Sequence, residues 1–172
     1  MDSIKINDYE AGTVLGKYFK EKGHKSVVFA GVTESDEAVG IERKQGFIDA
    51  FTDENENSSV NFVETGFAFK KSYEMTPEIL KYSPTAIACA TDNICLGILR
   101  YLHENNIKVP EEVSVAGFGG YEISSVAYPA LTTVAFNYEL TGQKTAQGIL
   151  DLIEGKELDE KNDIPLKLIE RE

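Results

Sequence analysis

A glycine-rich turn is the first part of the sequence that could do chemistry. In "VSVAGFGGYEISS" (113–125), an apolar run breaks at Gly117, Gly119 and Gly120 before a polar stretch able to start a helix. A dinucleotide site requires G-x-G-x-x-G, with the pyrophosphate beside a helix N-terminus. Glu122 occupies the position of the third glycine, and its negative charge would repel a phosphate. The turn therefore favours a pocket other than a nucleotide cradle.

Other catalytic and metal-binding motifs are missing. The sequence has no G-x-x-x-x-G-K-[ST] and no G-x-S-x-G, and its two histidines and two cysteines lack the spacing of a zinc site. Cys89 and Cys95 stand at apolar positions, where reduced core cysteines are expected. An enzyme stays open as an alternative, but no nucleophile or base stands out. We predict a protein that is not an enzyme, with no catalytic residue, cofactor or metal.

Charge and hydropathy limit the possible partners. The 172 residues include 29 acidic and 17 basic ones, which gives a formal net charge of −12. Without a basic patch the chain cannot release counterions from a nucleic-acid backbone, so we predict that it does not bind DNA by itself. No apolar run approaches the roughly 20 residues that cross a bilayer, and the N-terminus does not resemble a signal peptide. We expect no membrane association and a cytoplasmic location.

Short β-branched runs alternate with longer amphipathic stretches. This pattern is typical of an α/β fold with a doubly wound, mostly parallel sheet. The runs expected to form strands are 26–32, 60–65, 85–90, 113–118, 131–136 and 166–170. The stretches expected to form helices are 10–22, 38–51, 138–154 and the residues that follow Asp92, a candidate N-cap. Pro77 argues against one continuous helix through 72–82.

Polar and aromatic residues follow the predicted strands, where open α/β sheets bind their ligands. In chain order these strand ends provide Asp36, Phe67, Thr91, Asp92, Gly119, Phe136 and Asn137. Arg43 lies on the predicted helix after the first strand. Aromatic rings stack on the C–H face of a pyranose, while Arg and Asp bind its hydroxyl groups. The set predicts a sugar site, although Phe67 and Phe136 also suit core positions, Arg43 a surface position and Asp92 an N-cap.

Several stretches resemble the effector-binding region of the lac-repressor/gal-repressor (LacI/GalR) family of transcription regulators. They include "DYEAGTVLGKYFKEKGHKSVVFAG" (8–31), "IERKQGFIDAF" (41–51), "PTAIACATDNICLGILRYLHENNIKVPEEVSVAGFGG" (84–120), "PALTTVAFNYELTGQKTAQGILDLIEGK" (129–156) and "LIERE" (168–172). The motifs occur in the order and spacing of the family, and the resemblance covers nearly the whole chain.

The resemblance implies a fold like that of type I periplasmic binding proteins. Such proteins have two doubly wound subdomains joined by three crossovers, with the effector in the cleft between them. The chain would be truncated, without the DNA-binding headpiece and part of the N-terminal subdomain. The implied assignment is 1–23 and 137–160 to a remnant of the N-terminal subdomain, and 24–136 and 161–172 to the C-terminal subdomain. The crossovers would fall near Gly23, near Phe136 and near 160.

The resemblance also assigns roles to individual residues. Arg43 matches an arginine that binds effector hydroxyls, and Phe67 matches an aromatic residue that stacks on the ligand. Thr91 matches a polar effector contact, Asp92 matches a regular aspartate of the family, and Phe136 matches a residue that faces the cleft. Asp8 and Tyr9 match positions at the cleft edge.

One departure from the family pattern concerns the glycine turn. The family usually has "GFDD" after the fourth strand, and the first aspartate often grips the effector, whereas this chain has Gly119 and Gly120. Either the effector is larger and uses the space, or Asp36, Asn137 or Glu122 replaces the anchor. The first alternative points to a disaccharide such as sucrose or another glucoside.

The function implied is that of a cytosolic sugar-sensing domain of a repressor. A sugar effector would reorient the subdomains and change DNA binding through the headpiece that the resemblance implies. A homodimer is also expected from the resemblance. A periplasmic sugar-binding protein of a transport system shares the fold and is the alternative.

Overall fold

A six-stranded sheet organises residues 4–52, 57–156 and 164–171, which the computed structural model describes. The strand order is β2-β1-β3-β4-β5-β6, with the first five strands parallel and β6 antiparallel to β5. The strands are β1 (Ser26–Gly31), β2 (Ser59–Glu64), β3 (Ala86–Cys89), β4 (Ser114–Gly119), β5 (Thr132–Phe136) and β6 (Leu166–Ile169). All six predicted strands and the mostly parallel α/β sheet are confirmed.

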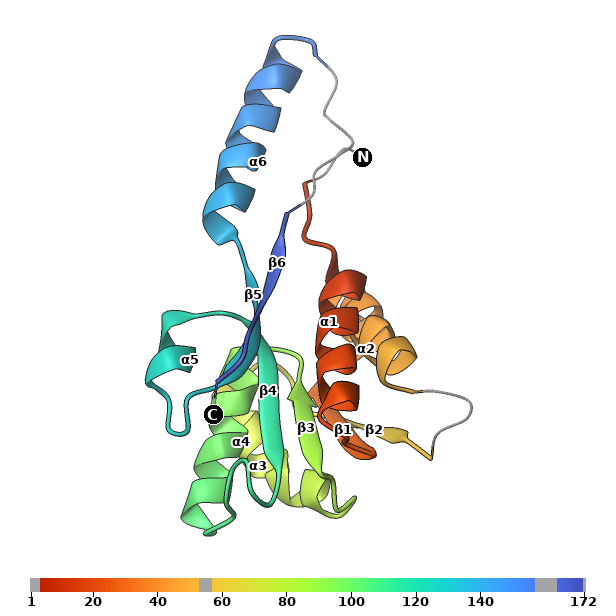
Figure 1. Cartoon of the computed structure of the whole chain (residues 1–172). Coiled ribbons are helices and arrows are strands. Elements are labelled where there is room, and N and C mark those ends of the chain that lie inside the picture. Colours follow the sequence, from red (N-terminus) through yellow and green to blue (C-terminus); the bar gives the residue numbers. More distant parts are fainter. Residues whose placement is uncertain (1–3, 53–56, 157–163, 172) are drawn as a thin grey trace.

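Two pairs of helices flank the sheet (Figure 1). α1 (Asp8–Glu21) packs on α2 (Lys44–Phe51), and α3 (Phe69–Leu80) packs on α4 (Asp92–Glu104). The remaining helical segments are the π-helical η1 (Glu37–Arg43), the short α5 (Glu122–Val126) and α6 (Tyr138–Ile153). A parallel sheet covered in this way requires strands that are apolar on both faces, and β3 is buried throughout.

The hydrophobic core lies between the sheet and these helices. Phe47 of α2 is central to it, because its ring contacts Phe19 of α1, Phe29 of β1 and Phe51 of α2. All four rings are buried. The two cysteines are free and buried, as predicted. The core therefore fixes α1 and α2 on the sheet. The first turn of each helix then lies next to the carboxyl ends of the strands.

The prediction of a break at Pro77 was wrong, because α3 continues through this residue. Proline removes one helical hydrogen bond, but packing on α4 holds the segment in place. The hydroxyl of the buried Thr76 donates to the Ser72 carbonyl (2.8 Å), and Ile79 is fully buried. The burial of this face outweighs the local cost of proline.

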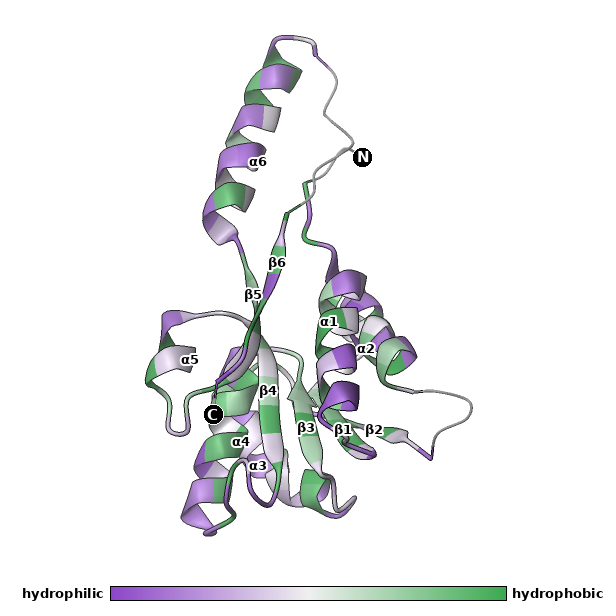
Figure 2. Ribbon diagram, in the orientation of Figure 1, coloured by the Kyte–Doolittle hydropathy of each residue, from purple (hydrophilic) through white to green (hydrophobic). Residues whose placement is uncertain are grey.

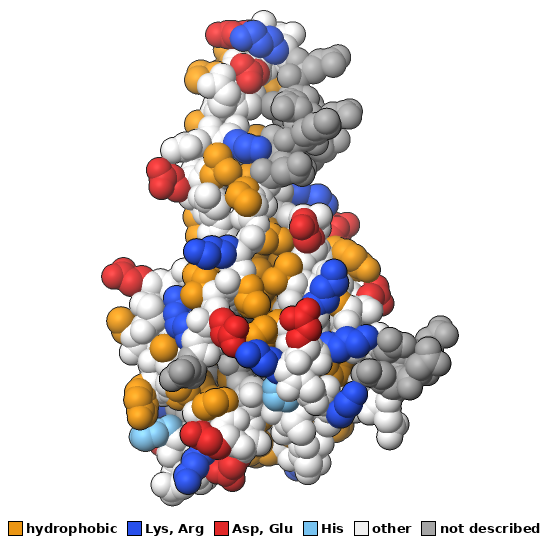
Figure 3. Space-filling model, viewed as in Figure 1, with side chains coloured by type: hydrophobic (Ala, Val, Ile, Leu, Met, Phe, Trp, Pro, Cys, Tyr) orange, Lys and Arg blue, Asp and Glu red, His pale blue; other side chains and the backbone are white. Residues whose placement is uncertain are grey.

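α6 projects away from the body of the molecule (Figure 1), and hydrophilic and hydrophobic residues alternate along it (Figure 2). Of its 16 residues only Gly148 is buried. Hydrophobic side chains also gather between the body and α6 (Figure 3). The apolar stripe predicted for this helix is therefore exposed, including Ile149, Leu150 and Ile153.

The placement of α1 bears on the proposed subdomains. Residues 1–23 were assigned to a remnant of the N-terminal subdomain, yet Ala11, Leu15 and Phe19 of α1 belong to the same core as the strands. In the structure α1 thus lies with the part assigned to the C-terminal subdomain. The division into subdomains as a whole stays a prediction, and the crossover expected near 160 lies outside the described residues.

Candidate functional site

The site begins where α1 closely approaches the end of η1 and the start of α2. A Cβ atom added to Gly12 would lie 2.0 Å from the carbonyl oxygen of Arg43, and one added to Gly46 would lie 2.0 Å from that of Tyr9. Only glycine allows the two backbones to come this close. This contact holds Asp8, at the start of α1, beside Arg43, at the end of η1.

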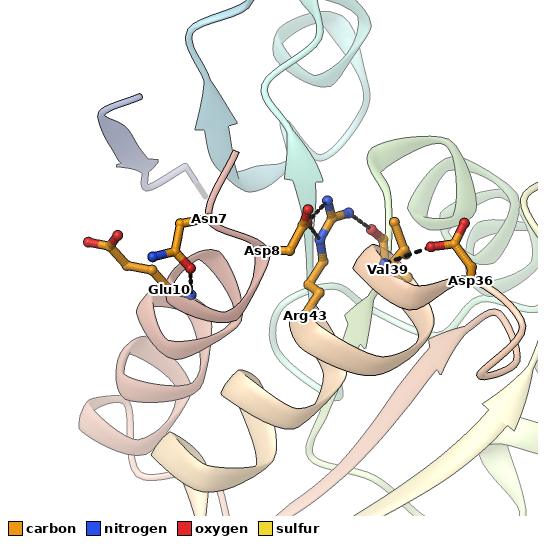
Figure 4. Close-up of polar contacts among 7 residues, drawn as sticks. Asn7, Asp8, Glu10, Asp36, Val39 and Arg43 are labelled. Atoms are coloured by element: carbon orange, nitrogen blue, oxygen red, sulfur yellow. Dashed lines mark hydrogen bonds and ion pairs between the residues drawn. The ribbon is translucent and has the colours of Figure 1, made fainter. Parts of the chain in front are cut away.

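Arg43 is the centre of the site (Figure 4). Its Nε donates to Oδ1 of Asp8 (2.8 Å), its Nη2 forms an ion pair with the same carboxylate oxygen, and its Nη1 donates to the carbonyl of Ala90 (2.5 Å). Arg43 is only 5% exposed, so these contacts act with little screening by water. Among the described residues, they engage three of its five N–H groups. These contacts leave the second N–H of each Nη group.

Two aromatic rings enclose the guanidinium. The Cζ atom of Arg43 lies 5.0 Å from the ring centroid of Phe118 on β4 and 5.0 Å from that of Phe136 on β5. A cation over an aromatic ring is attracted by the negative face of the ring. The rings and the Asp8 carboxylate together fix the orientation of Arg43.

Asp92 holds the glycine turn after β4. Its Oδ2 accepts hydrogen bonds from the backbone N–H of Gly120 (2.9 Å) and Tyr121 (3.3 Å) and from the hydroxyl of Ser124 (2.6 Å). Its Oδ1 accepts from the hydroxyl of Thr133 (2.7 Å). Asp92 is fully buried, so its carboxylate serves the protein itself. This network connects β4, α4, α5 and β5 at the carboxyl end of the sheet.

Most of the other predicted residues cap helices near the carboxyl end of the sheet. Asp36 caps η1 by accepting from the N–H of Val39 (2.8 Å), as Figure 4 shows. Thr91 caps α4 and Asn137 caps α6, so the predicted N-cap at Asp92 is displaced by one residue. The hydroxyl of Tyr9 donates to Asp49 on α2 (2.9 Å), and the structure does not bring this residue to Arg43.

The alternatives that the sequence left open are now decided for three residues. Arg43 is buried rather than on the surface, and Asp92 is not an N-cap. Phe67 is 46% exposed, so it is not a core residue. Its backbone carbonyl accepts a hydrogen bond from Nδ2 of Asn93 on α4 (3.0 Å), which links the end of β2 to the start of α4. Phe136 is half-buried against Arg43.

The sequence did not single out Tyr121, Tyr138 or Phe118. Tyr121 is stacked on Tyr138 with ring centroids 5.8 Å apart and planes at 7°. Partial burial raises the pKa of the Tyr138 phenol above its ordinary value, and the contact with Tyr121 is the second cause in size. Tyr121 follows the glycine turn directly and Tyr138 comes two residues after Phe136. Their nearness to predicted residues was the only available signal.

A pocket of about 370 Å³ lies at the opposite end of the sheet, near Tyr18, Lys22 and Arg171. Its charged groups bind one another or the backbone: Lys22 pairs with Glu170, and Arg171 Nη1 donates to the carbonyl of Leu131 (2.6 Å). In the described ranges, no group of three or more His, Cys, Asp or Glu side chains is arranged to hold a metal ion. None of the helices described is long and apolar enough to span a membrane. The residues around Arg43 are therefore the stronger candidate.

The order of the strands and the site at their carboxyl ends agree with a family of ligand-binding domains. The model of the periplasmic binding protein-like domain matches residues 17–172. The chain belongs to this family. The predicted type of fold is thereby confirmed.

Two curated relatives illustrate this similarity. The sucrose operon repressor of Staphylococcus xylosus is 31% identical over 157 residues, which cover 90% of this chain and 48% of the relative. The HTH-type transcriptional regulator TreR of Salmonella typhimurium is 30% identical over 154 residues, covering 90% of this chain and 47% of that protein. The periplasmic binding protein-like chain thus spans about half the length of the curated relatives it matches.

Solved structures of LacI family regulators are also similar. One from Enterococcus faecium, with bound ribose, superposes with a TM-score of 0.88 at 26% identity over 99% of this chain and 64% of that chain. Another from Enterococcus faecalis, also with bound ribose, has a TM-score of 0.87 at 30% identity over 96% of this chain and 60% of that chain. The resemblance to LacI family regulators inferred from the sequence is confirmed.

Proposed function

We propose that this chain is the sugar-sensing effector-binding region of a LacI-type transcription repressor. The observation that carries the proposal is Arg43, which is held by Asp8 and two rings and keeps two N–H donors at the carboxyl end of the sheet. Guanidinium groups bind hydroxyl pairs in a fixed geometry, and aromatic rings cover sugar C–H faces. The named relatives are regulators, which favours this function over a binding protein of a transport system.

The proposal includes several finer points. The effector is a sugar that acts by its different affinity for two arrangements of the domain, without catalysis. The regulator acts in the cytoplasm as a homodimer, and operator DNA is the target of the whole protein. The site residues proposed are those of the predicted set that lie with Arg43, which contacts both Asp8 and Phe136.

A calorimetric screen tests the proposal. The 172-residue chain is titrated with monosaccharides, disaccharides including sucrose, and phosphorylated sugars. We expect at least one to bind, and the variants Arg43→Ala and Arg43→Lys to lose that binding, where Arg43→Lys keeps a cation beside Asp8 so that the fold is retained. Arg100→Ala is the matched control, because Arg100 is an exposed arginine that pairs with Glu104 on α4. Failure of every sugar to bind, or binding that is indifferent to Arg43, would contradict the proposal.

A further inference from the structure

Three aromatic rings form a continuous series from Arg43 to the glycine turn. Phe136 lies over the Arg43 guanidinium, and its ring is nearly perpendicular to that of Tyr138 at 5.9 Å and 82°. Tyr138, at the start of α6, is stacked in turn on Tyr121, which follows β4. Tyr121 and Tyr138 are 43% and 46% exposed. Both rings therefore keep surface that a ligand can cover.

The ring of Tyr121 occupies the space that a side chain at position 119 would need. A Cβ atom added to Gly119 would lie 2.7, 3.0 and 3.1 Å from three atoms of this ring, and the φ angle of Gly119 is +134°. An L side chain rarely adopts that backbone conformation. A side chain at position 119 would therefore require the Tyr121 ring to move from its observed place. This chain has an aromatic ring in the place where an aspartate at position 119 would project.

The aspartates near this place are already engaged. Asp8 accepts from Arg43, Asp92 is fully buried with four donors, and Asp36 caps η1. Among the described residues of the site, the buried carboxylates of Asp8 and Asp92 are therefore not free for a ligand, while the rings of Tyr121 and Tyr138 and the carboxylate of Glu122 are exposed. A ligand with an apolar face fits the two rings, and Glu122 can accept from one of its hydroxyl groups.

We propose that Tyr121 determines effector specificity, and that the effector is a hexopyranoside whose C–H face covers the Tyr121–Tyr138 pair. This inference rests on the proposed function, because it names the class of sugar for that same site. Burial of apolar C–H surface on a ring supplies the binding free energy that a carboxylate would supply through hydroxyl groups. A pentose such as ribose offers less of this surface, since it has one carbon fewer. The pair therefore favours hexopyranosides over ribose.

Calorimetry with four defined sugars tests the inference. The 172-residue chain is titrated with glucose, methyl β-D-glucopyranoside, sucrose and ribose. We expect at least one hexopyranoside to bind more tightly than ribose, and Tyr121→Ala to weaken that binding by at least about fivefold. Tyr121→Phe keeps the ring and should stay within about threefold of the parent chain. Tyr82→Ala is the matched control, because Tyr82 is an exposed tyrosine at the end of α3, outside the site.

A second measurement does not depend on a substitution. Saturation-transfer NMR on the parent chain, with irradiation of the aromatic protons, should label the axial C–H protons of the bound hexopyranoside more strongly than its hydroxymethyl protons. Urea unfolding of each variant shows whether it folds. If Tyr121→Ala does not fold, Tyr121→Leu takes its place in the titrations, because leucine keeps an apolar side chain at this position but has no ring, and binding that stays unchanged in it overturns the inference.

The outcomes separate the two proposals. Hexopyranoside binding that is lost in Arg43→Ala but unchanged in Tyr121→Ala overturns this inference alone, as does a preference for ribose. Absence of binding by any sugar overturns both the inference and the proposed function. Tight hexopyranoside binding that falls with Tyr121→Ala, with labelled axial protons, supports both.

Discussion

Asp8 and Arg43 form a buried ion pair although 35 residues separate them in the chain. The pair joins the first turn of α1 to the end of η1, and both residues are less than 10% exposed. Burial of two charges is costly unless they satisfy each other and further hydrogen bonds, as the Ala90 carbonyl does here for Arg43. The pair thus holds a guanidinium in a fixed orientation at the place where a ligand would bind.

Loss of either partner should destabilise the chain. Arg43→Ala leaves the Asp8 carboxylate buried without its cation, and we expect the free energy of unfolding to fall by about 3 to 5 kcal/mol. Asp8→Ala should have a similar effect through the buried guanidinium. Urea unfolding of both single variants and the double variant checks this, because the double variant should cost much less than the sum. Additive effects would show that the two side chains do not depend on each other.

The close approach of α1 and η1 gives a second prediction. Gly12→Ala places a methyl group 2.0 Å from the Arg43 carbonyl oxygen and 2.7 Å from the backbone nitrogen of Phe47, so the helices must separate. We expect a loss of about 3 kcal/mol in urea unfolding. Gly142→Ala is the matched control, because a Cβ there meets nothing within 4 Å and alanine favours the helix. Equal stability of the two variants would contradict the observed packing.

The Asp92 network gives a third prediction. Asp92→Ala removes the acceptor of two backbone N–H groups and two hydroxyls, and we expect a loss of about 3 kcal/mol. Asp92→Asn should cost less, because the hydroxyl of Thr133 can accept from the new amide while the amide oxygen serves the turn. The exposed Asp49→Ala provides a control that should stay within about 1 kcal/mol. Near-UV circular dichroism should report loss of the Tyr121–Tyr138 stack in Asp92→Ala alone.

Much of the fold could be predicted from the sequence. Each strand is a short apolar run between turn residues, and a sheet covered on both faces requires that pattern. The ends of the strands could be located for the same reason, which placed Phe136 in the predicted site, while Arg43 was added from the predicted helix after the first strand. Both residues contact each other in the structure.

The contacts that organise the site could not be predicted in this way. The ion pair joins Asp8 to Arg43 through a close helix approach, and no local pattern indicates that two backbones touch. The break predicted at Pro77 is not found in α3, because local helix propensity does not include the stabilisation that comes from packing on α4. Tyr121 and Tyr138 meet because β4 and β5 are neighbours in the sheet, which is a property of strand order rather than of either segment.

The phenol of Tyr138 gives the last prediction. Its pKa is raised mainly by partial burial and then by Tyr121, because both disfavour the charged phenolate. In the unfolded chain this group should titrate near pH 10. The contribution of the neutral Tyr138 phenol to the free energy of unfolding is therefore complete below about pH 10. It is lost as the pH rises through the pKa of the folded state. Ultraviolet titration at alkaline pH should be compared between the parent chain and Tyr138→Phe. The tyrosine signal missing from the variant should be one that titrates at higher pH than an ordinary tyrosine. Tyr121→Ala should shift the titration of Tyr138 to lower pH, because it uncovers the phenol, and an unchanged curve would show that the stack does not protect this group.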